Sequence, residues 1–148
     1  MECSSFVKKL AFVPAQWYNV LMKEYIAYEG ERYTIEWYYT AKGESQPLEF
    51  FEELTAVEQQ KLFHIIKRLG DFGFVSDITK FRNEGDDIYA MKPQPSRFLS
   101  FFYEGNKIII TNAFTKKAQK LKKQDKERAL NARTDYIKRV KEGVYYED

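Results

Sequence analysis

The stretch from residue 97 to residue 117 has the pattern of two strands joined by a tight turn. Positions 97, 99, 101 and 103 share one face of an extended segment, and positions 98, 100 and 102 share the other. Residues 108–114 are β-branched and nearly all apolar, which predicts a strand covered on both faces. Gly105 and Asn106 suit the positive φ values of a two-residue turn. The stretch is therefore predicted to form a β-hairpin.

The open end of this hairpin carries cations. Arg97 begins the first strand, and Lys116 and Lys117 follow the second. In an antiparallel pair, the start of one strand lies beside the end of the next. We therefore expect Arg97, Lys116 and Lys117 to converge at one edge of the sheet, where they would suit a phosphate group.

Two further strands are predicted from shorter patterns. Side chains of residues 33–39 fall on two faces with a period of two, which predicts a strand. Residues 88–92 are predicted to form a second, short strand. It ends at Pro93 and Pro95, because proline cannot donate a main-chain hydrogen bond to a neighbouring strand. Residues 71–87 are predicted to be a loop.

Helices are predicted between and after these strands. Residues 47–54 form a short helix that opens with proline. Thr55 and Glu58 then form a capping box for a helix to about Leu69, ended by Gly70 and Gly73. Residues 125–141 form the last helix, in which Arg133 falls inside the apolar stripe. A cation there must extend to solvent, pair with an acceptor or line a site.

The order of elements is strand, two helices, three strands and helix. This order predicts an α+β domain over residues 31–148, with helices packed on a small, mainly antiparallel sheet. Residues 1–30 are predicted to be a helical N-terminal extension, with residues 15–28 the strongest helix candidate and Met22 an alternative start. Residues 143–148 are expected to fray.

Composition limits the possible chemistry. The chain has 12 Phe and 11 Tyr residues, which supports a real core. Cys3 and His64 are the only residues of their types, so a disulfide framework, a Cys- or His-rich metal site and a two-histidine ribonuclease mechanism are excluded. His64 is expected to be an exposed surface residue. No apolar run approaches the roughly 20 residues of a membrane span, and we expect a reducing, cytoplasmic location.

Charge is unevenly spread along the chain. Residues 1–115 hold 13 Lys or Arg against 16 Asp or Glu, a net charge of −3, whereas residues 116–148 hold 11 against 6, a net charge of +5. This asymmetry fits either a polyanionic partner or a solvated helix face, and charge alone favours the solvated face. No nucleotide-binding glycine loop, nucleophile elbow or metalloprotease motif occurs. The cations and aromatic residues that remain suit a nucleic acid.

Several of these features together resemble the RelE superfamily of toxin–antitoxin toxins. They are the order of elements, the strand that begins Arg97-Phe98-Leu99, and the segments NAFTKKAQK and ERALNARTDYIKR. The HigB-like, phage-associated branch ends its last strand in Phe-x-Lys-Lys, here residues 114–117, and follows it with Ala-x-x-x-Arg, here residues 129–133. The resemblance covers roughly residues 33–140.

The resemblance implies a toxin that cleaves messenger RNA, usually on the ribosome, without a metal ion or other cofactor. In this chemistry the 2′-hydroxyl attacks the adjacent phosphate and leaves a cyclic phosphate and a free 5′-hydroxyl. The implied partners are an antitoxin, of the helix-turn-helix type, together with messenger RNA and the ribosome. Two alternatives stay open: gyrase inhibition, as in the ParE branch, or a phage protein that binds nucleic acid without catalysis.

The resemblance also assigns residues. Catalytic roles fall on Arg97, Lys116, Lys117 and Lys92, and we expect RNA contacts from Lys80, Arg82, Lys120, Lys122 and Lys123. The chain departs from the RelE branch in two places: Ala90 replaces a second basic residue, and Lys123 stands near a tyrosine proposed to transfer protons. The general base is therefore open between Tyr103, Tyr89 and a water molecule.

Overall fold

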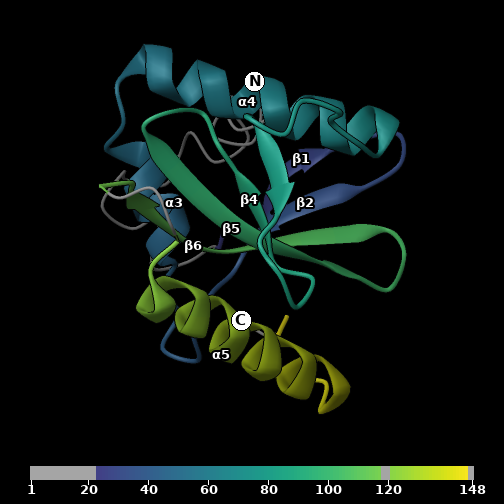
Figure 1. Cartoon of the computed structure of the whole chain (residues 1–148). Coiled ribbons are helices and arrows are strands. Elements are labelled where there is room, and N and C mark those ends of the chain that lie inside the picture. Colours follow the sequence, from purple (N-terminus) through teal and green to yellow (C-terminus); the bar gives the residue numbers. More distant parts are fainter. Residues whose placement is uncertain (1–22, 118–120, 147–148) are drawn as a thin grey trace, which may run out of the picture.

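The computed structural model describes residues 23–117 and 121–146. One mixed sheet separates two helical layers, with α4 on one side and α5 on the other (Figure 1). The strands are β1 (Ile26–Glu29), β2 (Thr34–Trp37), β3 (Phe81–Asn83), β4 (Tyr89–Met91), β5 (Ser96–Tyr103) and β6 (Lys107–Thr115). The helices are α3 (Gln46–Glu52), α4 (Ala56–Phe72) and α5 (Lys123–Lys141).

The spatial order of the strands is β1-β2-β6-β5-β4-β3. Only β2 and β6 pair in parallel; every other neighbouring pair is antiparallel. The predicted α+β class with a mainly antiparallel sheet is confirmed. None of the helices in the described ranges is both long and apolar enough to cross a membrane.

The sheet has six strands where four were predicted, and both additional strands lie at its edges. β3 lies within residues 71–87, so the prediction of a continuous loop there is wrong. β1 lies within the predicted extension, so the helix predicted over residues 15–28 is wrong at Ile26–Tyr28; residues 1–22 are outside the described part. Both strands are short, and main-chain pairing with an inner strand, β2 or β4, holds each of them in place.

The end of α4 also differs from the prediction. The helix passes through Gly70 and ends at Phe72, and Gly73 supplies the left-handed cap with φ of 86°. Gly70 serves packing instead, because its carbonyl accepts the main-chain N–H groups of Arg32 and Tyr33 at 2.7 and 2.9 Å. A Cβ atom on Gly30 would lie 2.2 Å from the Gly70 carbonyl carbon. This close approach lets β1 and β2 pack against the helix.

The hairpin of β5 and β6 forms as predicted, except at its turn. Tyr103 pairs with Lys107, so the turn has three residues. Positive φ angles of 55° and 76° occur at Glu104 and Gly105, one position earlier than predicted. Ser100 pairs with Ile110 and Leu99 with Asn112, so Thr111 is an additional, bulged residue in β6.

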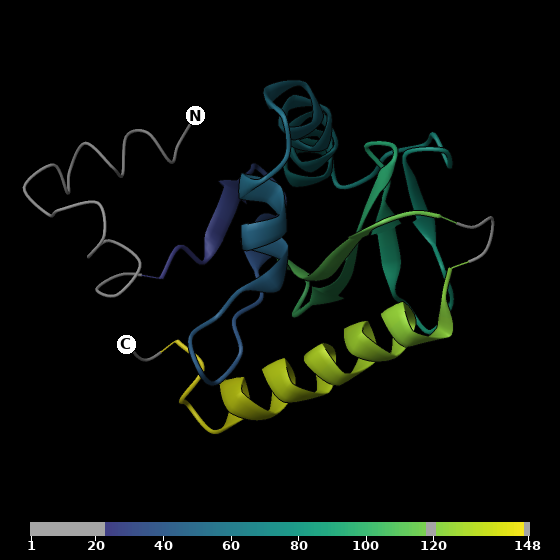
Figure 2. The same cartoon turned by 90° about the vertical axis from the view of Figure 1, so that its left-hand side faces the viewer.

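Alternation along β5 divides its side chains between two cores, as predicted. Phe98 is fully buried in the core against α3 and α4, whereas Leu99 and Phe101 belong to the core against α5. Figure 2 shows α5 running along the side of the sheet away from α4. His64 is exposed on α4, as predicted.

The C-terminal segment packs instead of fraying. Tyr145 is only 1% exposed and its ring centroid lies 4.6 Å from that of Tyr136. The Tyr145 hydroxyl accepts the main-chain N–H of Tyr39 at 2.9 Å, and the Arg139 guanidinium lies 4.7 Å from the Tyr145 ring centroid. The tail thus closes the core beneath α5, so the fraying prediction is wrong up to Tyr146.

Candidate functional site

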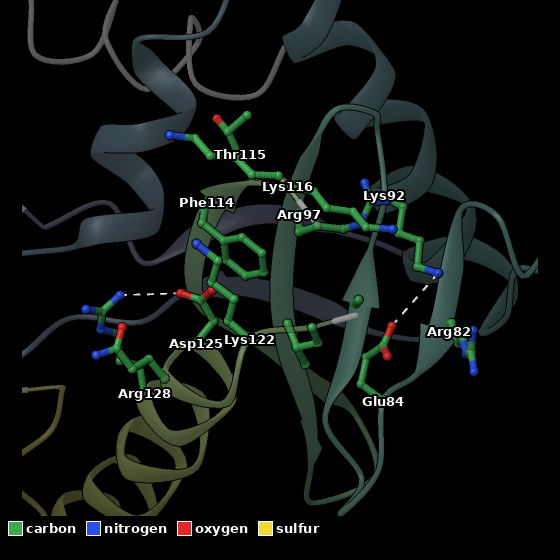
Figure 3. A pocket seen from close by; sticks show the side chains of 14 residues that line it. Arg82, Glu84, Lys92, Arg97, Phe114, Thr115, Lys116, Lys122, Asp125 and Arg128 are labelled. Atoms are coloured by element: carbon green, nitrogen blue, oxygen red, sulfur yellow. Dashed lines mark hydrogen bonds and ion pairs between the residues drawn. The ribbon is translucent and has the colours of Figure 1, made fainter. Parts of the chain in front are cut away.

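A cavity of about 470 Å³, here called the basic pocket, lies where β5 begins and β6 ends. The first turn of α5 forms one wall, and the edge strand β3 with its neighbour β4 forms the other (Figure 3). Its lining comprises Arg82, Glu84, Ala90, Lys92, Arg97, Phe114, Thr115, Lys116, Lys117, Leu121, Lys122, Gln124, Asp125 and Arg128. The predicted convergence of Arg97, Lys116 and Lys117 is confirmed, and Lys92 joins them.

The pocket carries seven cations and only two carboxylates. Each carboxylate already has a cation: Glu84 lies 3.9 Å from Lys92, and Asp125 lies 3.3 Å from Arg128, as the dashed lines in Figure 3 show. The other five cations form no ion pair within the described ranges. The pocket therefore has an excess of positive charge that suits an anion.

Arg97 is the most deeply placed of these cations, at only 6% exposure. Its Nη1 donates to the Gln94 side-chain oxygen at 3.1 Å and to the Ser96 carbonyl at 3.0 Å. Its Nε and Nη2 have no partner among the residues that the structure describes. Burial lowers the pKa of Arg97, yet a guanidinium stays charged in proteins. A buried charge with free donors is the arrangement that binds two oxygens of one phosphate.

Lys92 follows the end of β4, and its side chain is 12% exposed. Its Nζ donates to the Ile78 carbonyl at 3.3 Å. Burial lowers the pKa of Lys92, and the neighbouring cations Arg97, Arg82 and Lys116 lower it further, while Glu84 opposes them. Lys92 therefore releases its proton more readily than an ordinary lysine does.

Lys116 and Lys117 lie just beyond β6. The main-chain N–H of Lys116 donates to the Pro95 carbonyl at 3.0 Å, which continues the β5–β6 pairing past the ends of the strands. Lys116 is half-buried and Lys117 is exposed. The pair therefore offers one inner and one outer cation at the mouth of the pocket.

Only some of the residues predicted to contact RNA line the basic pocket. Arg82 and Lys122 line the basic pocket. Lys80 lines a separate groove against α4, which shares Lys92 with the pocket. Lys123 points to solvent with a side chain that is 91% exposed, near Glu127. Lys120 lies outside the described residues.

Three charged residues of the pocket were missed from the sequence, namely Glu84, Asp125 and Arg128. Asp125 stands in the first turn of α5 and is 6% exposed, and Arg128 follows one turn later. The sequence signal for this wall was Asp125 itself, an acidic residue at the predicted start of the last helix that directly follows a lysine-rich segment. Tyr89 and Tyr103, considered as general bases, do not line the pocket. Arg133 also lies elsewhere, where its guanidinium donates to the Asp86 carbonyl at 2.6 Å.

Residues 49–134 match the model of a family described as phage-derived protein Gp49-like (DUF891). The chain belongs to this family. The Gp49-like family is a RelE-like toxin family, so the resemblance to the toxin superfamily is confirmed at that level, while the HigB-like branch stays a prediction. The matched range contains every residue that lines the basic pocket. No individual curated protein matches the chain.

Proposed function

We propose that this Gp49-like protein is the toxin of a type II toxin–antitoxin pair and cleaves messenger RNA in the basic pocket, on the ribosome and in the cytoplasm. The observation that carries the proposal is Arg97, which is 6% exposed and keeps two nitrogens free toward a cavity with seven cations. A pocket of this charge attracts a phosphodiester and repels a metal cation. We therefore assign cleavage to the side chains alone.

The proposed reaction is an internal transesterification. The 2′-oxygen forms a bond to the adjacent phosphorus, the bond from phosphorus to the 5′-oxygen breaks, and the electron pair leaves with the 5′-oxygen. Negative charge builds on the non-bridging oxygens in between. Arg97, with Lys116 and Lys117 beside it, would stabilise that charge, because fixed cations in a partly dry site need little reorganisation.

The same reaction moves two protons. The 2′-hydroxyl must lose one, and the leaving 5′-oxygen must gain one. We assign the acceptor role to the Glu84 carboxylate, which lies 3.9 Å from the Lys92 ammonium group, and the donor role to Lys92. The lowered pKa of Lys92 favours donation. This assignment replaces Tyr89 and Tyr103, which lie away from the pocket.

Expression of the chain alone in bacteria tests the proposal. We expect growth arrest with fragmented messenger RNA, and fragments that end in a cyclic phosphate. Arg97→Lys should restore growth. Arrest with intact RNA and inhibited gyrase would show ParE-like binding instead, and normal growth at high expression would favour a phage protein that binds nucleic acid without cleaving it.

The antitoxin partner is tested separately, by co-expression with the protein encoded by the neighbouring gene. A neutralising partner should co-purify with the chain and suppress the arrest. The unpaired cations of the pocket suit an acidic segment that orders on binding.

A further inference from the structure

A second cavity of about 470 Å³ adjoins the basic pocket and is here called the α5 crevice. It lies between the N-terminal half of α5, the bulged part of β6 and the start of α3. Arg128 lines both cavities. Because the two cavities share a side chain that is 66% exposed, a ligand can extend from one into the other.

The two cavities differ in chemistry. The basic pocket offers mainly cations, whereas the α5 crevice is lined by the side-chain amides of Gln46, Asn112 and Asn131, the carboxylate of Asp135, and the methyl groups of Ala113 and Ala132. Gln46 is occupied, because its amide exchanges two hydrogen bonds of 2.8 Å with the main chain of Ala113. Asn112, Asn131 and Asp135 remain to contact a ligand.

Asn112 is a buried amide with an unused donor. It is 6% exposed; its amide nitrogen donates to the Asp125 carbonyl at 3.2 Å, and its oxygen accepts from Thr111 at 2.7 Å. The second N–H has no partner among the described residues. A buried donor without a partner is unfavourable by about 1–3 kcal/mol. A ligand in the crevice would remove that penalty.

Asp135 and Asn131 add acceptors on the helix side. All described contacts of Asp135, with Tyr38 and Arg139, use Oδ2, so its Oδ1 is free to accept. Asn131 makes no described hydrogen bond and can both donate and accept. The α5 wall thus mainly accepts hydrogen bonds, with Arg128 as a donor where the crevice meets the basic pocket, the opposite wall donates one, and methyl groups lie nearby. A flat, uncharged ring with hydrogen-bonding edges matches this set.

We propose that the α5 crevice binds the base of a nucleotide next to the cleaved phosphate and selects a base with an exocyclic amino group, which is adenine, cytosine or guanine, over uracil. An amino group donates to Asp135 Oδ1 and the Asn131 oxygen. Uracil has no amino group, and its carbonyl groups would be repelled by the Asp135 carboxylate. This inference rests on the proposed function, because it takes RNA as the occupant of the basic pocket.

The test uses 2′-O-methyl uridine hexamers with A, C or G at one interior position. They cannot be cleaved by 2′-hydroxyl attack, so binding is measured apart from cleavage. We expect the A, C and G hexamers to bind about tenfold tighter than the all-U hexamer, as one good base contact provides. The side-chain amide signals of Asn112 should shift in NMR spectra with the A, C and G hexamers but not with the all-U hexamer.

Asn131→Ala should remove the preference while binding of the all-U hexamer stays within twofold. Asn131 is exposed, so this variant is expected to fold. Asn106→Ala, which removes an exposed amide at the hairpin turn, is the matched control and should keep the preference. A preference that survives Asn131→Ala, equal binding of all hexamers, or no binding would each overturn the inference.

The failure of this inference can be told apart from failure of the proposed function. Cleavage of natural RNA with no base preference would refute the base site alone. A preference over uracil that depends on Asn131, without cleavage of natural RNA, would support the base site and refute the endoribonuclease.

Discussion

Arg97 of β5 lies directly opposite Phe114 of β6, and both side chains line the basic pocket. The pairing holds the arginine against an aromatic wall and beside Lys116, which comes two residues after Phe114. The Arg97 side chain is buried and its guanidinium donates to Gln94 and to the Ser96 carbonyl, so its remaining donors are oriented before substrate arrives. Preorganisation of this kind is where electrostatic catalysis gains most of its effect.

Arg97→Lys should therefore affect rate more than binding. Lysine keeps the charge but loses the planar pair of donors that contacts two phosphate oxygens. We expect cleavage at saturating RNA to fall about a hundredfold, the effect of removing one transition-state donor, with a much smaller change in affinity. Single-turnover cleavage with and without ribosomes, and binding at several salt concentrations, measure the two quantities.

The matched control is Lys123→Ala, because Lys123 points to solvent outside the pocket. Lys122 is unsuitable because it lines the pocket. The control should leave saturated cleavage unchanged. If Arg97→Lys weakens binding and spares saturated cleavage, the pocket only docks RNA.

Lys92→Met should abolish cleavage and stabilise the fold. The lowered pKa of Lys92 means that the native state disfavours its charged form, so the protonated lysine opposes folding at neutral pH. This opposition declines as pH rises from the native pKa towards the ordinary value of 10.5. An apolar side chain of similar length removes the repulsion from Arg97 and Lys116. We expect the free energy of unfolding in urea to increase by about 1 kcal/mol.

Lys92→Arg serves as the comparison, because it retains a charge at the same place. It should give no stabilisation. A loss of stability in Lys92→Met would show that the contacts of Lys92 with Glu84 and Ile78 outweigh the repulsion.

Alkaline pH should unfold the protein through its buried tyrosines. Burial is the main cause that raises the pKa of Tyr38, Tyr39 and Tyr136 to about 12 from an ordinary 10.0. The unfolded chain ionises first, so the stability from these groups is complete below pH 10 and is lost as pH rises towards about 12. Each shift corresponds to at most about 3 kcal/mol.

Urea unfolding at several pH values, with tyrosinate absorbance followed in parallel, checks this expectation. Tyr38→Phe keeps the ring and removes the ionisable group, so it should flatten part of the alkaline decline. An unchanged decline in that variant would assign the effect to other residues.

Tyr145→Ala should destabilise the protein although it changes the fourth residue from the end of the chain. The ring is 1% exposed and packs against Tyr136, so its removal leaves a cavity that is expected to lower the free energy of unfolding by about 3–5 kcal/mol. Val144→Ala, at a side chain that is 44% exposed, is the neighbouring control and should change stability little. Thermal and urea unfolding measure both variants.

Local sequence patterns were sufficient to predict most of the helices and strands and one edge of the basic pocket. Alternation along residues 97–103 assigns Phe98 and Leu99 to opposite faces, and Thr55 with Glu58 marks the start of α4, because both signals act between neighbours in the chain. The convergence of Arg97, Lys116 and Lys117 follows from antiparallel pairing alone. The α+β class follows from the order of those elements.

Long-range packing decided the rest. β1 and β3 are too short to be recognised from their own residues and exist because β2 and β4 present open edges to them. Gly70 resembles a helix end in sequence, but the approach of Gly30 makes it a packing residue inside α4. Tyr145 is held by Tyr39, more than a hundred residues away. Arg128 and Asp125 join the pocket only once α5 docks on the sheet beside Asn112, and Glu84 joins it only once β3 pairs with β4. No local pattern encodes these contacts.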